Sequence, residues 1–307
     1  MSPTGAAPRD ILVGVDGGGT KTLVRIEDRD GRQLGHGQGG PANVQHSVEG
    51  SWRSILDAVG KALAQAGLSL DDRRHRLFCG AGLAGTEVVS AHDRFLATPH
   101  PFARLIVKSD GYISCLGAHD GRDGMVIAIG TGTIAFQIED GREERAGGWG
   151  FPHGDEGGGA WLGLEAVRLT FHALDGRAES SPLTDAVFDR FDRDLNRLVS
   201  FATRANATQF AQIAPMVIEE AGRGTALASS LLARAAGEID RLAAALTAKA
   251  SRPDLPCALL GGLAPFIEPR LDPLLRSRLV RGERDAVHGA LLLIRRAVEA
   301  DATGPYS

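Results

Sequence analysis

A glycine-rich segment near the start of this chain has the residue types needed to bind a phosphate. An apolar run over 11–15 leads into Asp16, and Gly17, Gly18, Gly19 and Thr20 follow directly. Glycines lack a Cβ and let several backbone N–H groups converge on one anion, while a neighbouring carboxylate can position Mg²⁺. The sequence therefore predicts a phosphate-binding turn at 17–20, with Asp16 as the metal-binding residue.

A second segment repeats this arrangement. The apolar run over 125–129 is followed by Gly130, Thr131, Gly132 and Thr133. One such turn is weak evidence, because a plain β-hairpin uses the same residues. Two turns of this kind, each between predicted strands, favour phosphate binding, and the two threonine hydroxyl groups add hydrogen-bond donors.

The composition excludes several classes of protein. The chain has 307 residues, of which 43% are hydrophobic and 23% charged, and its net charge is -4. This length predicts about two globular domains, and the scattered Lys and Arg residues argue against nucleic acid or an anionic membrane as partner. The three cysteines are not at metal-ligand spacing, and no apolar run is long enough to span a bilayer. We expect a cytoplasmic protein with a small-molecule partner.

The apolar periodicity predicts two series of elements that begin alike. The first series contains strands at 11–15, 22–27, 33–38, 76–79 and 104–107, with helices at 52–67 and 87–97. The second begins with three strands between 125 and 146 and continues with helices at 161–174, 182–198, 209–221 and 226–250, a strand at 257–260 and a helix at 286–300. A boundary near 118–124 divides the two series.

Four motifs, in chain order, resemble a known family. They are Asp16–Thr20, Gly130–Thr133, the segment Gly147–Gly150 with Asp155–Gly157, and Gly261-Gly262. On these residues the chain resembles the N-acetylglucosamine kinase and glucosamine kinase branch, which is grouped with the BadF/BadG/BcrA/BcrD-type ATPases in the actin, hexokinase and sugar-kinase superfamily.

This resemblance implies an α/β fold of two ribonuclease-H-like lobes around a central cleft. Residues 1–118 would form an N-terminal lobe that binds phosphate and sugar. Residues 119–307 would form a C-terminal nucleotide-binding lobe with a helical insert at about 158–250. The last helix, 286–300, lies within the sequence range of the C-terminal lobe. The alternative is that it packs back on the N-terminal lobe.

The resemblance also implies an activity, the transfer of the γ-phosphate of ATP to the 6-hydroxyl of glucosamine or N-acetylglucosamine. In that reading the amides of 17–20 and the turn at 130–133 bind the ATP phosphates, and Asp16 holds Mg²⁺ through water. Gly261 and Gly262 correspond to the family's adenosine loop, for which a helix-start turn is the alternative. A homodimer is the family precedent.

Phosphoryl transfer to an alcohol needs a carboxylate near the acceptor hydroxyl, and Asp110 is the candidate general base. It follows a predicted strand, and its alternative role is to cap the next helix. The resemblance assigns the sugar to Asn43, Asp110, the backbone at Gly148, and Asp155. The alternatives are an Asx-turn for Asn43 and helix capping for Asp155 and its neighbour Glu156. Glu156 and His153 are left unassigned.

Three departures bear on the identity of the sugar. Some N-acetylglucosamine kinases have Ser-Asn after the second glycine turn, where this chain has Thr133-Ile134. The segment 82–85 offers no side-chain hydroxyl for an N-acetyl group, and Phe151-Pro152 is closer to the glucosamine kinases. The sequence therefore leaves the two amino sugars open.

Two other functions compete with a kinase. Residues Gly80–Gly85 match G-x-G-x-x-G after a strand, which would fit an NAD(P)-dependent oxidoreductase, although Asp110, the acidic residue at the end of the next strand, lies beyond the usual spacing of about 20 residues. A non-catalytic sugar-binding regulator on the kinase fold is the other alternative. The presence of both Asp16 and Asp110 argues against it.

Overall fold

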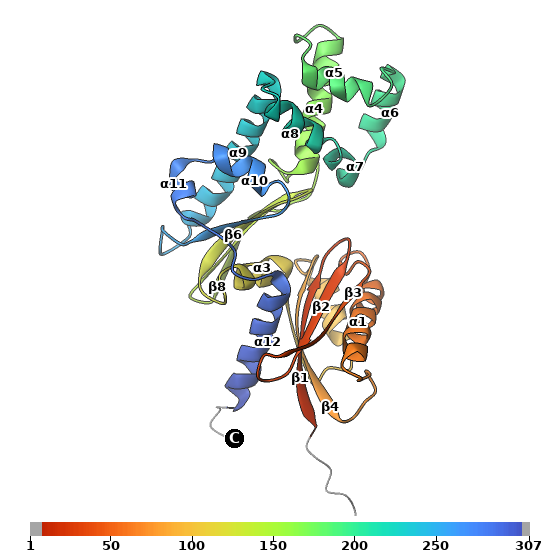
Figure 1. The fold of residues 1–307 in the computed structure, drawn as a ribbon, viewed down its shortest axis with the longest axis vertical. Coiled ribbons are helices and arrows are strands. Elements are labelled where there is room, and N and C mark those ends of the chain that lie inside the picture. The colour runs from red at the N-terminus through yellow and green to blue at the C-terminus, as the bar shows by residue number, and fades with distance from the viewer. Residues whose placement is uncertain (1–7, 303–307) are drawn as a thin grey trace, which may run out of the picture. The chain divides into compact units, whose positions relative to one another are not determined.

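The structure is a computed structural model that describes residues 8–302. The chain divides into two compact units (Figure 1). Within the described residues, the first unit contains the chain up to Asp123 together with the residues from Gly282 onward. The second unit is Gly124–Arg281.

The first unit is built on a five-stranded sheet with the order β3-β2-β1-β4-β5. Strands β2 and β3 pair antiparallel, as do β1 and β2, whereas β4 and β5 run parallel to β1. The strands are β1 (Arg9–Gly17), β2 (Thr22–Glu27), β3 (Gln33–Gly39), β4 (His75–Leu83) and β5 (Arg104–Ser109). The helices are α1 (Val48–Gln65), α2 (Val89–Ala97), α3 (Asp110–Ala118) and α12 (Ala286–Ala302).

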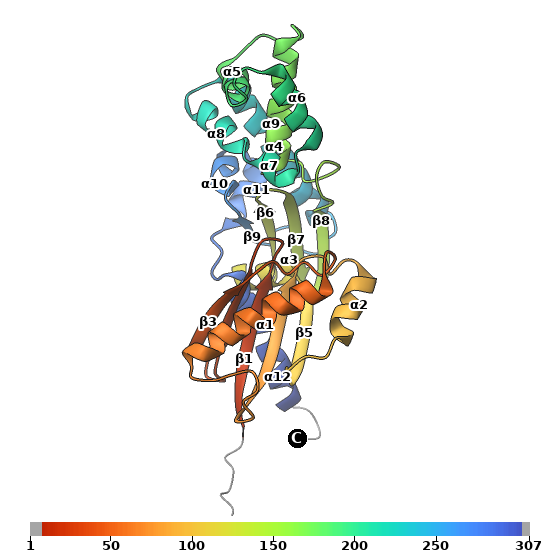
Figure 2. The ribbon, with the colours of Figure 1, turned by 90° about the vertical axis from the view of Figure 1, so that its right-hand side faces the viewer.

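Strand β1 is buried on both faces because its side chains alternate between two helical layers. Ile11, Val13 and Val15 belong to the core that α1 covers, as Figure 2 shows for the position of α1 over the sheet. Leu12 instead packs with side chains of α12 on the other face. By the same alternation, Asp16 is on the α12 side.

The second unit repeats the sheet of the first. Its order is β10-β9-β6-β7-β8, so that three antiparallel strands, β6 to β8, are followed by two strands parallel to β6. The strands are β6 (Gly124–Ile129), β7 (Thr133–Glu139), β8 (Arg142–Gly147), β9 (Cys257–Leu260) and β10 (Leu279–Val280). Two sheets with one topology confirm the predicted α/β fold of paired ribonuclease-H-like lobes.

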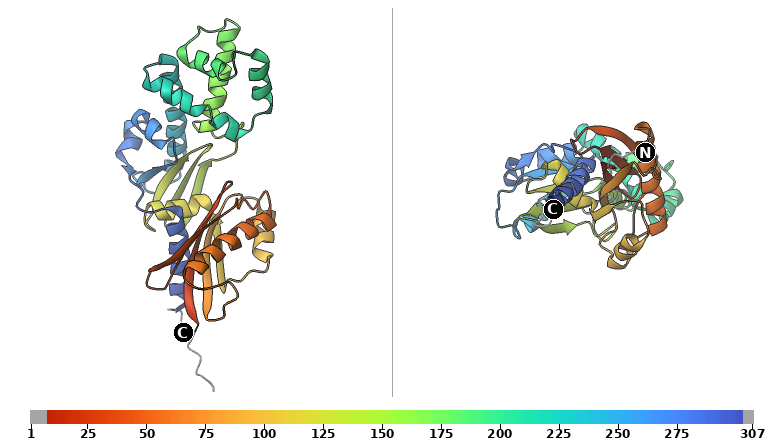
Figure 3. Two further views of the ribbon diagram at one scale, coloured as in Figure 1. Left: turned by 45° about the vertical axis from the view of Figure 1, so that its right-hand side comes forward. Right: turned by 90° about the horizontal axis from the view of Figure 1, so that it is seen from below.

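Helices cover the sheet of the second unit and extend beyond it (Figure 3). They are α4 (Gly159–Leu174), α5 (Pro182–Asp189), α6 (Leu195–Arg204), α7 (Ala207–Ala211), α8 (Ala214–Gly222), α9 (Ala226–Thr247), α10 (Ala264–Ile267), the 3₁₀ turn η1 (Glu268–Arg270) and α11 (Pro273–Ser277). The predicted helix at 182–198 is wrong, because Asp192 and Arg193 adopt positive φ angles of 56° and 54° and Asp194 then caps a new helix, α6.

Helices α3 and α12 approach each other very closely. A Cβ placed on Gly289 of α12 would lie 1.9 Å from the carbonyl oxygen of Ile113 and 2.7 Å from the backbone nitrogen of Gly117. A Cβ on Gly14 of β1 would likewise lie 2.6 Å from the carbonyl oxygen of Val287. Glycine at these positions therefore sets the distance between α12 and its neighbours.

We expect Gly289→Ala to lower the free energy of unfolding by about 3 kcal/mol, because backbone atoms must move to admit the methyl group. Gly60→Ala in α1 is the matched control, since a Cβ there has no neighbour within 4 Å. The control should stabilise the helix by about 0.5–1 kcal/mol. Thermal and urea unfolding of the two variants measure the difference, and equal stabilities would contradict the packing argument.

Candidate functional site

The turn between β1 and β2 forms the first predicted phosphate site. The N–H of Gly18 donates to the carbonyl of Lys21 at 3.0 Å and closes the turn. Gly17 lies within β1, where a Cβ would come 2.6 Å from a methyl carbon of Leu83, so packing accounts for glycine there. Gly19 and Thr20 are exposed at the tip. The amides best placed for an anion are therefore those at the tip.

The carbonyls of this turn hold the segments that carry the predicted sugar residues. Ala42 N–H donates to Gly18 at 2.9 Å, and Ala84 N–H donates to Gly17 at 2.9 Å. Asn43 and Ala84 then form a parallel bridge. The structure thus brings Asn43 next to the turn at 17–20.

Asn43 makes the Asx-turn that was the alternative to sugar binding. Its Oδ1 accepts from the N–H groups of Gln45 at 3.0 Å and His46 at 3.2 Å. Over residues 8–302, its Nδ2 group has no protein acceptor, so this half of the amide is the part that fits a sugar hydroxyl.

Asp110 is the first residue of α3 but is not its cap. Ser109 is the N-cap, and its Oγ accepts from Tyr112 N–H at 3.2 Å. The Asp110 carboxylate accepts from Gly111 N–H at 2.8 Å. Burial raises the pKa of Asp110 and the negative charge of Glu87 raises it further, while the Gly111 hydrogen bond opposes the shift. The capping interpretation of Asp110 is therefore wrong, and its carboxyl group is tuned toward a higher proton affinity.

Asp16 is a largely desolvated carboxylate with other carboxylates near it. Burial, together with the charges of Asp110 and Asp285 and against the opposing charge of Lys21, raises its pKa from 3.8 to about 6. Sequence reasoning missed Asp285. Its position just before α12, where its Oδ1 accepts from His288 N–H at 2.8 Å, is a helix-capping pattern that could have drawn attention to it.

The residues around Asp16 fit a divalent cation. A desolvated carboxylate near two others gains from a positive charge, and Mg²⁺ prefers oxygen donors while retaining several waters. Over the described range, no group of three or more His, Cys, Asp or Glu side chains is arranged to ligate one ion. Asp16 is the residue that would hold Mg²⁺.

Asp16→Asn should stabilise the metal-free protein above pH 6 and not near pH 4. The folded state binds the Asp16 proton more tightly than the unfolded chain, so stability falls as pH rises from about 4 to about 6. Removing this ionisation should recover up to about 3 kcal/mol at pH 8. Thermal unfolding from pH 4 to 8 tests this, with the exposed Asp57→Asn as control; a pH-independent difference would contradict the assignment.

In the second unit, the turn Gly130–Thr133 is anchored on the start of α4. Gly130 N–H donates to Gly132 carbonyl at 2.9 Å within the turn. The carbonyls of Gly130 and Thr131 accept from Gly159 and Ala160, each at 2.8 Å. These bonds satisfy the first amides of the helix, which otherwise lack partners. The turn is thereby held rigid, with Thr131 exposed at its tip.

Thr133 differs from Thr131 in its surroundings. It is buried, and its Oγ1 has no hydrogen-bond partner within the described residues. A Cβ on Gly158 would lie 2.9 Å from this oxygen, so the hydroxyl points toward the segment before α4. Of the two threonines, Thr131 therefore presents the better-placed hydroxyl for a ligand.

Asp155 connects the second glycine turn to the Gly-Trp-Gly segment. Burial raises the pKa of its carboxylate, and the nearby backbone N–H groups of Thr133, Gly150 and Phe151 oppose this rise. A Cβ on Gly132 would lie 2.3 Å from Asp155 Oδ2. Asp155 therefore packs closely against the turn.

The neighbours of Asp155 have other roles. Gly158, and neither acidic residue, is the N-cap of α4, so the capping alternative for Asp155 and Glu156 is wrong. Glu156 and His153 are exposed. Gly148 has φ 69° and donates its N–H to Thr133 carbonyl at 2.9 Å.

Gly261 and Gly262 lie beside the end of β6, close to where the second glycine turn begins. Gly261 has φ 91°, and a Cβ there would lie 2.4 Å from the carbonyl oxygen of Ile129. That same carbonyl accepts from Leu263 N–H at 3.1 Å. Gly262 is exposed with open space around it, which suits the approach of a flat ligand.

The G-x-G-x-x-G match at Gly80–Gly85 is not a dinucleotide turn. Its first two glycines lie inside β4, where Cβ atoms would come 2.2 Å from the carbonyl oxygen of Ala290 and from Ile113 Cγ1, respectively. These glycines admit α12 and α3 against the sheet. A dinucleotide motif instead requires the glycines in a turn between strand and helix, so the oxidoreductase alternative loses its structural basis.

The paired sheets and their glycine turns define a protein of the actin-like ATPase and sugar-kinase class. The chain belongs to the BadF/BadG/BcrA/BcrD ATPase family, whose model matches residues 13–271. This confirms the family resemblance inferred from the four motifs.

Two relatives and two solved structures place the chain within this class. It is 35% identical to glucosamine kinase GspK of Vibrio cholerae over 92% of this chain and 95% of that protein. It is 28% identical to the N-acetylmuramic acid/N-acetylglucosamine kinase of Clostridium acetobutylicum over 74% of this chain and 76% of that one. A Chromobacterium violaceum structure, provisionally assigned as an N-acetylglucosamine kinase, matches with TM-score 0.84 and 40% identity over 94% of this chain and all of that one. The ROK hexokinase of Thermus thermophilus shares the fold, with TM-score 0.56 and 16% identity over 94% and 99% of the two chains.

Within residues 8–302, no helix combines the length and the apolar character that crossing a bilayer requires.

Proposed function

We propose that this protein is an ATP-dependent kinase that transfers the γ-phosphate to the 6-hydroxyl of an amino sugar, glucosamine or N-acetylglucosamine. One observation carries the proposal: two buried carboxylates with raised pKa values, Asp16 and Asp110, belong to the unit that carries the exposed glycine turn, and the charge of Asp110 acts on Asp16. A metal-binding carboxylate, a base and a phosphate cradle are the parts that phosphoryl transfer to an alcohol requires. The similarity to kinases of amino sugars supports the acceptor class.

Each candidate residue of the first unit has a separate role in the proposed reaction. The tip amides at Gly19 and Thr20 bind phosphate oxygens, and Asp16 would hold Mg²⁺, which would neutralise phosphate charge. Asp110 accepts the proton of the sugar hydroxyl as that oxygen attacks the γ-phosphorus and the bond from this phosphorus to the departing ADP oxygen breaks. Its raised pKa makes it a stronger base than an exposed aspartate. Asn43 donates through Nδ2 to the sugar.

In the second unit, further segments are assigned to ATP or to the sugar. The turn 130–133, through its backbone and the Thr131 hydroxyl, binds the nucleotide phosphates, and Gly261-Gly262 contacts adenosine. Gly148 and Asp155 contribute to sugar binding, and the Asp155 carboxylate lies near backbone N–H groups of the turn and the Gly-Trp-Gly segment.

Glucosamine is the preferred acceptor in our proposal. A Cβ on Gly148 would lie 2.7 Å from Ile134 Cδ1, so an apolar side chain lies under the Gly-Trp-Gly segment where some N-acetylglucosamine kinases have asparagine. The 35% identity to a glucosamine kinase points the same way.

A coupled assay of ADP release with a panel of sugars tests the function. Glucosamine, N-acetylglucosamine, glucose and a muramic-type sugar are compared at equal ATP and Mg²⁺. We expect the highest kcat/KM with glucosamine and loss of turnover when the cation is chelated. ADP release with none of the amino sugars would overturn the proposal, and binding of NAD(P) in a parallel titration would revive the oxidoreductase alternative.

Asp110→Asn should lower kcat by about 10²- to 10⁴-fold, the usual contribution of a general base, with a smaller effect on the KM for sugar. Ser109→Ala is the matched control, because it removes the cap of the same helix at a cost of about 1 kcal/mol without removing the carboxylate. Initial rates and thermal unfolding separate the two effects. Turnover of Asp110→Asn close to that of the unmodified protein would refute the base assignment.

Three further elements belong to this proposal. Mg²⁺ is the expected cation, since Asp16 provides the oxygen donor it prefers. A cytoplasmic location would supply ATP and sugar together. A homodimer follows the family precedent and is tested by light scattering.

A further inference from the structure

The residue immediately before α12 carries a carboxylate to which the proposed reaction assigns no role. Asp285 Oδ1 accepts from His288 N–H at 2.8 Å, and its Oδ2 accepts from Arg25 Nη2 at 2.5 Å. Arg25 belongs to β2, where it pairs with Gly14 of β1. Each oxygen of the Asp285 carboxylate therefore has a fixed partner, although the side chain is 55% exposed.

The packing of α12 on β1 places Asp285 close to Asp16. Leu12 packs against the C-terminal half of α12, and Gly14 lies against Val287 near its start. Two residues along a strand advance about 6.6 Å, and four along a helix advance about 6 Å. Asp16 is the next residue on the same face of β1. Along the axis of α12, it therefore lies at the height of the residues that precede this helix, which include Asp285. The electrostatic influence of Asp285 on Asp16 agrees with this placement.

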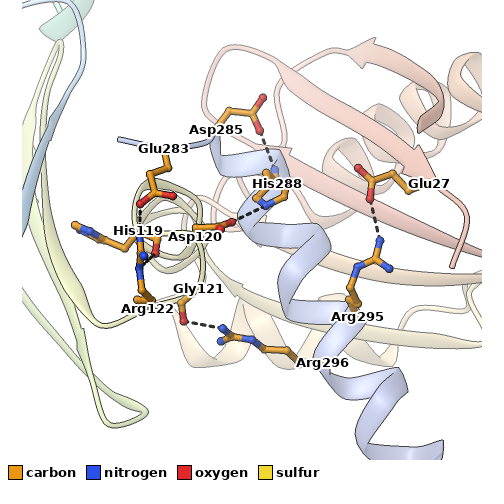
Figure 4. Close-up of polar contacts among 10 residues, drawn as sticks. All are labelled: Glu27, His119, Asp120, Gly121, Arg122, Glu283, Asp285, His288, Arg295 and Arg296. Carbon is orange, nitrogen blue, oxygen red and sulfur yellow. Dashed lines mark hydrogen bonds and ion pairs between the residues drawn. The ribbon is translucent and has the colours of Figure 1, made fainter. Parts of the chain in front are cut away.

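The start of α12 is fixed by contacts on several sides (Figure 4). Glu283 N–H donates to Ala118 carbonyl at 2.9 Å at the end of α3. Polar contacts along this helix and its approach include His288 Nε2 with Asp120 Oδ1 at 3.1 Å, Arg295 with Glu27 at 3.0 Å, Arg296 with the carbonyl of Gly121 at 2.6 Å, and the Arg122–Glu283 ion pair. Because α12 cannot shift easily, the position of Asp285 is determined by the fold.

We propose that Asp285 is a positioning residue for the metal–phosphate site at Asp16. Held by Arg25 and the His288 amide, its carboxylate supplies a fixed negative charge that strengthens the binding of a divalent cation beside the phosphate turn. Arg25 keeps the carboxylate oriented and limits its repulsion of the nucleotide. This inference rests on the proposed kinase function, and it assigns to Asp285 and Arg25 a role in cation affinity rather than in proton transfer.

Isothermal titration of ADP, with and without Mg²⁺, tests the role of Asp285 without turnover. Asp285→Asn preserves the size of the side chain and an oxygen acceptor for His288. We expect its ADP affinity without metal to equal or exceed that of the unmodified protein, because a negative charge is gone. The gain in affinity on adding Mg²⁺ should fall about tenfold.

Glu283→Gln is the matched control. It removes one negative charge two residues away, where the carboxylate pairs with Arg122, and it should leave the Mg²⁺ gain unchanged. Thermal unfolding confirms that both variants are folded. If Asp285→Asn keeps the full Mg²⁺ gain, or if both variants lose it equally, the assignment of Asp285 is wrong.

Arg25→Ala separates positioning from the simple sum of charges. A positioning role predicts that it also reduces the Mg²⁺ gain and that the double variant with Asp285→Asn is no worse than the single one. Stronger Mg²⁺ binding in Arg25→Ala, or additive losses, would overturn the role of Arg25. Absence of any Mg²⁺-dependent ADP binding in the unmodified protein would instead refute the proposed function, and the inference with it.

Discussion

The close approach of α3 and α12 to the first sheet is the constraint on which the candidate catalytic residues depend. Glycines at positions 14 and 82 of the strands, and at 117 and 289 of the helices, remove the side chains that would hold these elements apart. Asp16, Asp110 and Asp285 each lie at the end of one of these elements. Any residue larger than glycine at the contacts would move a carboxylate, so packing and chemistry are coupled through backbone distance.

The close packing of α3 and α12 on the sheet also brings carboxylates near Asp16, which costs electrostatic free energy. Burial raises the pKa values of Asp16 and Asp110, and the charges of Asp110 and Asp285 add to the rise at Asp16. Neighbouring groups offset part of this cost, with Lys21 acting on Asp16 and Arg25 paired with Asp285. Such a site is less stable when empty than when a cation is bound, which is the usual condition of sites that bind metal and phosphate together.

In the second unit, backbone hydrogen bonds hold the glycine turn in place, without the cluster of carboxylates found in the first unit. Two carbonyls of its glycine turn accept hydrogen bonds from the first amides of α4, and the Asp155 carboxylate lies near backbone N–H groups of the turn and the Gly-Trp-Gly segment. Both glycine turns therefore have rigid backbones, although one is surrounded by carboxylates and the other by backbone hydrogen bonds. Rigid amides lose little entropy when an anion binds, which favours affinity for phosphate.

The sequence by itself determined the family, the two-lobed α/β fold and the positions of the glycine turns, because apolar periodicity and glycine runs are local properties of the chain. Tertiary structure decided which polar groups are available. Thr133 is buried while Thr131 is exposed, Ser109 caps the helix that Asp110 begins, and Asp285 reaches Asp16 from a segment 269 residues away along the chain. Burial and long-range electrostatics depend on how distant segments pack, and no local pattern around Asp16 encodes them.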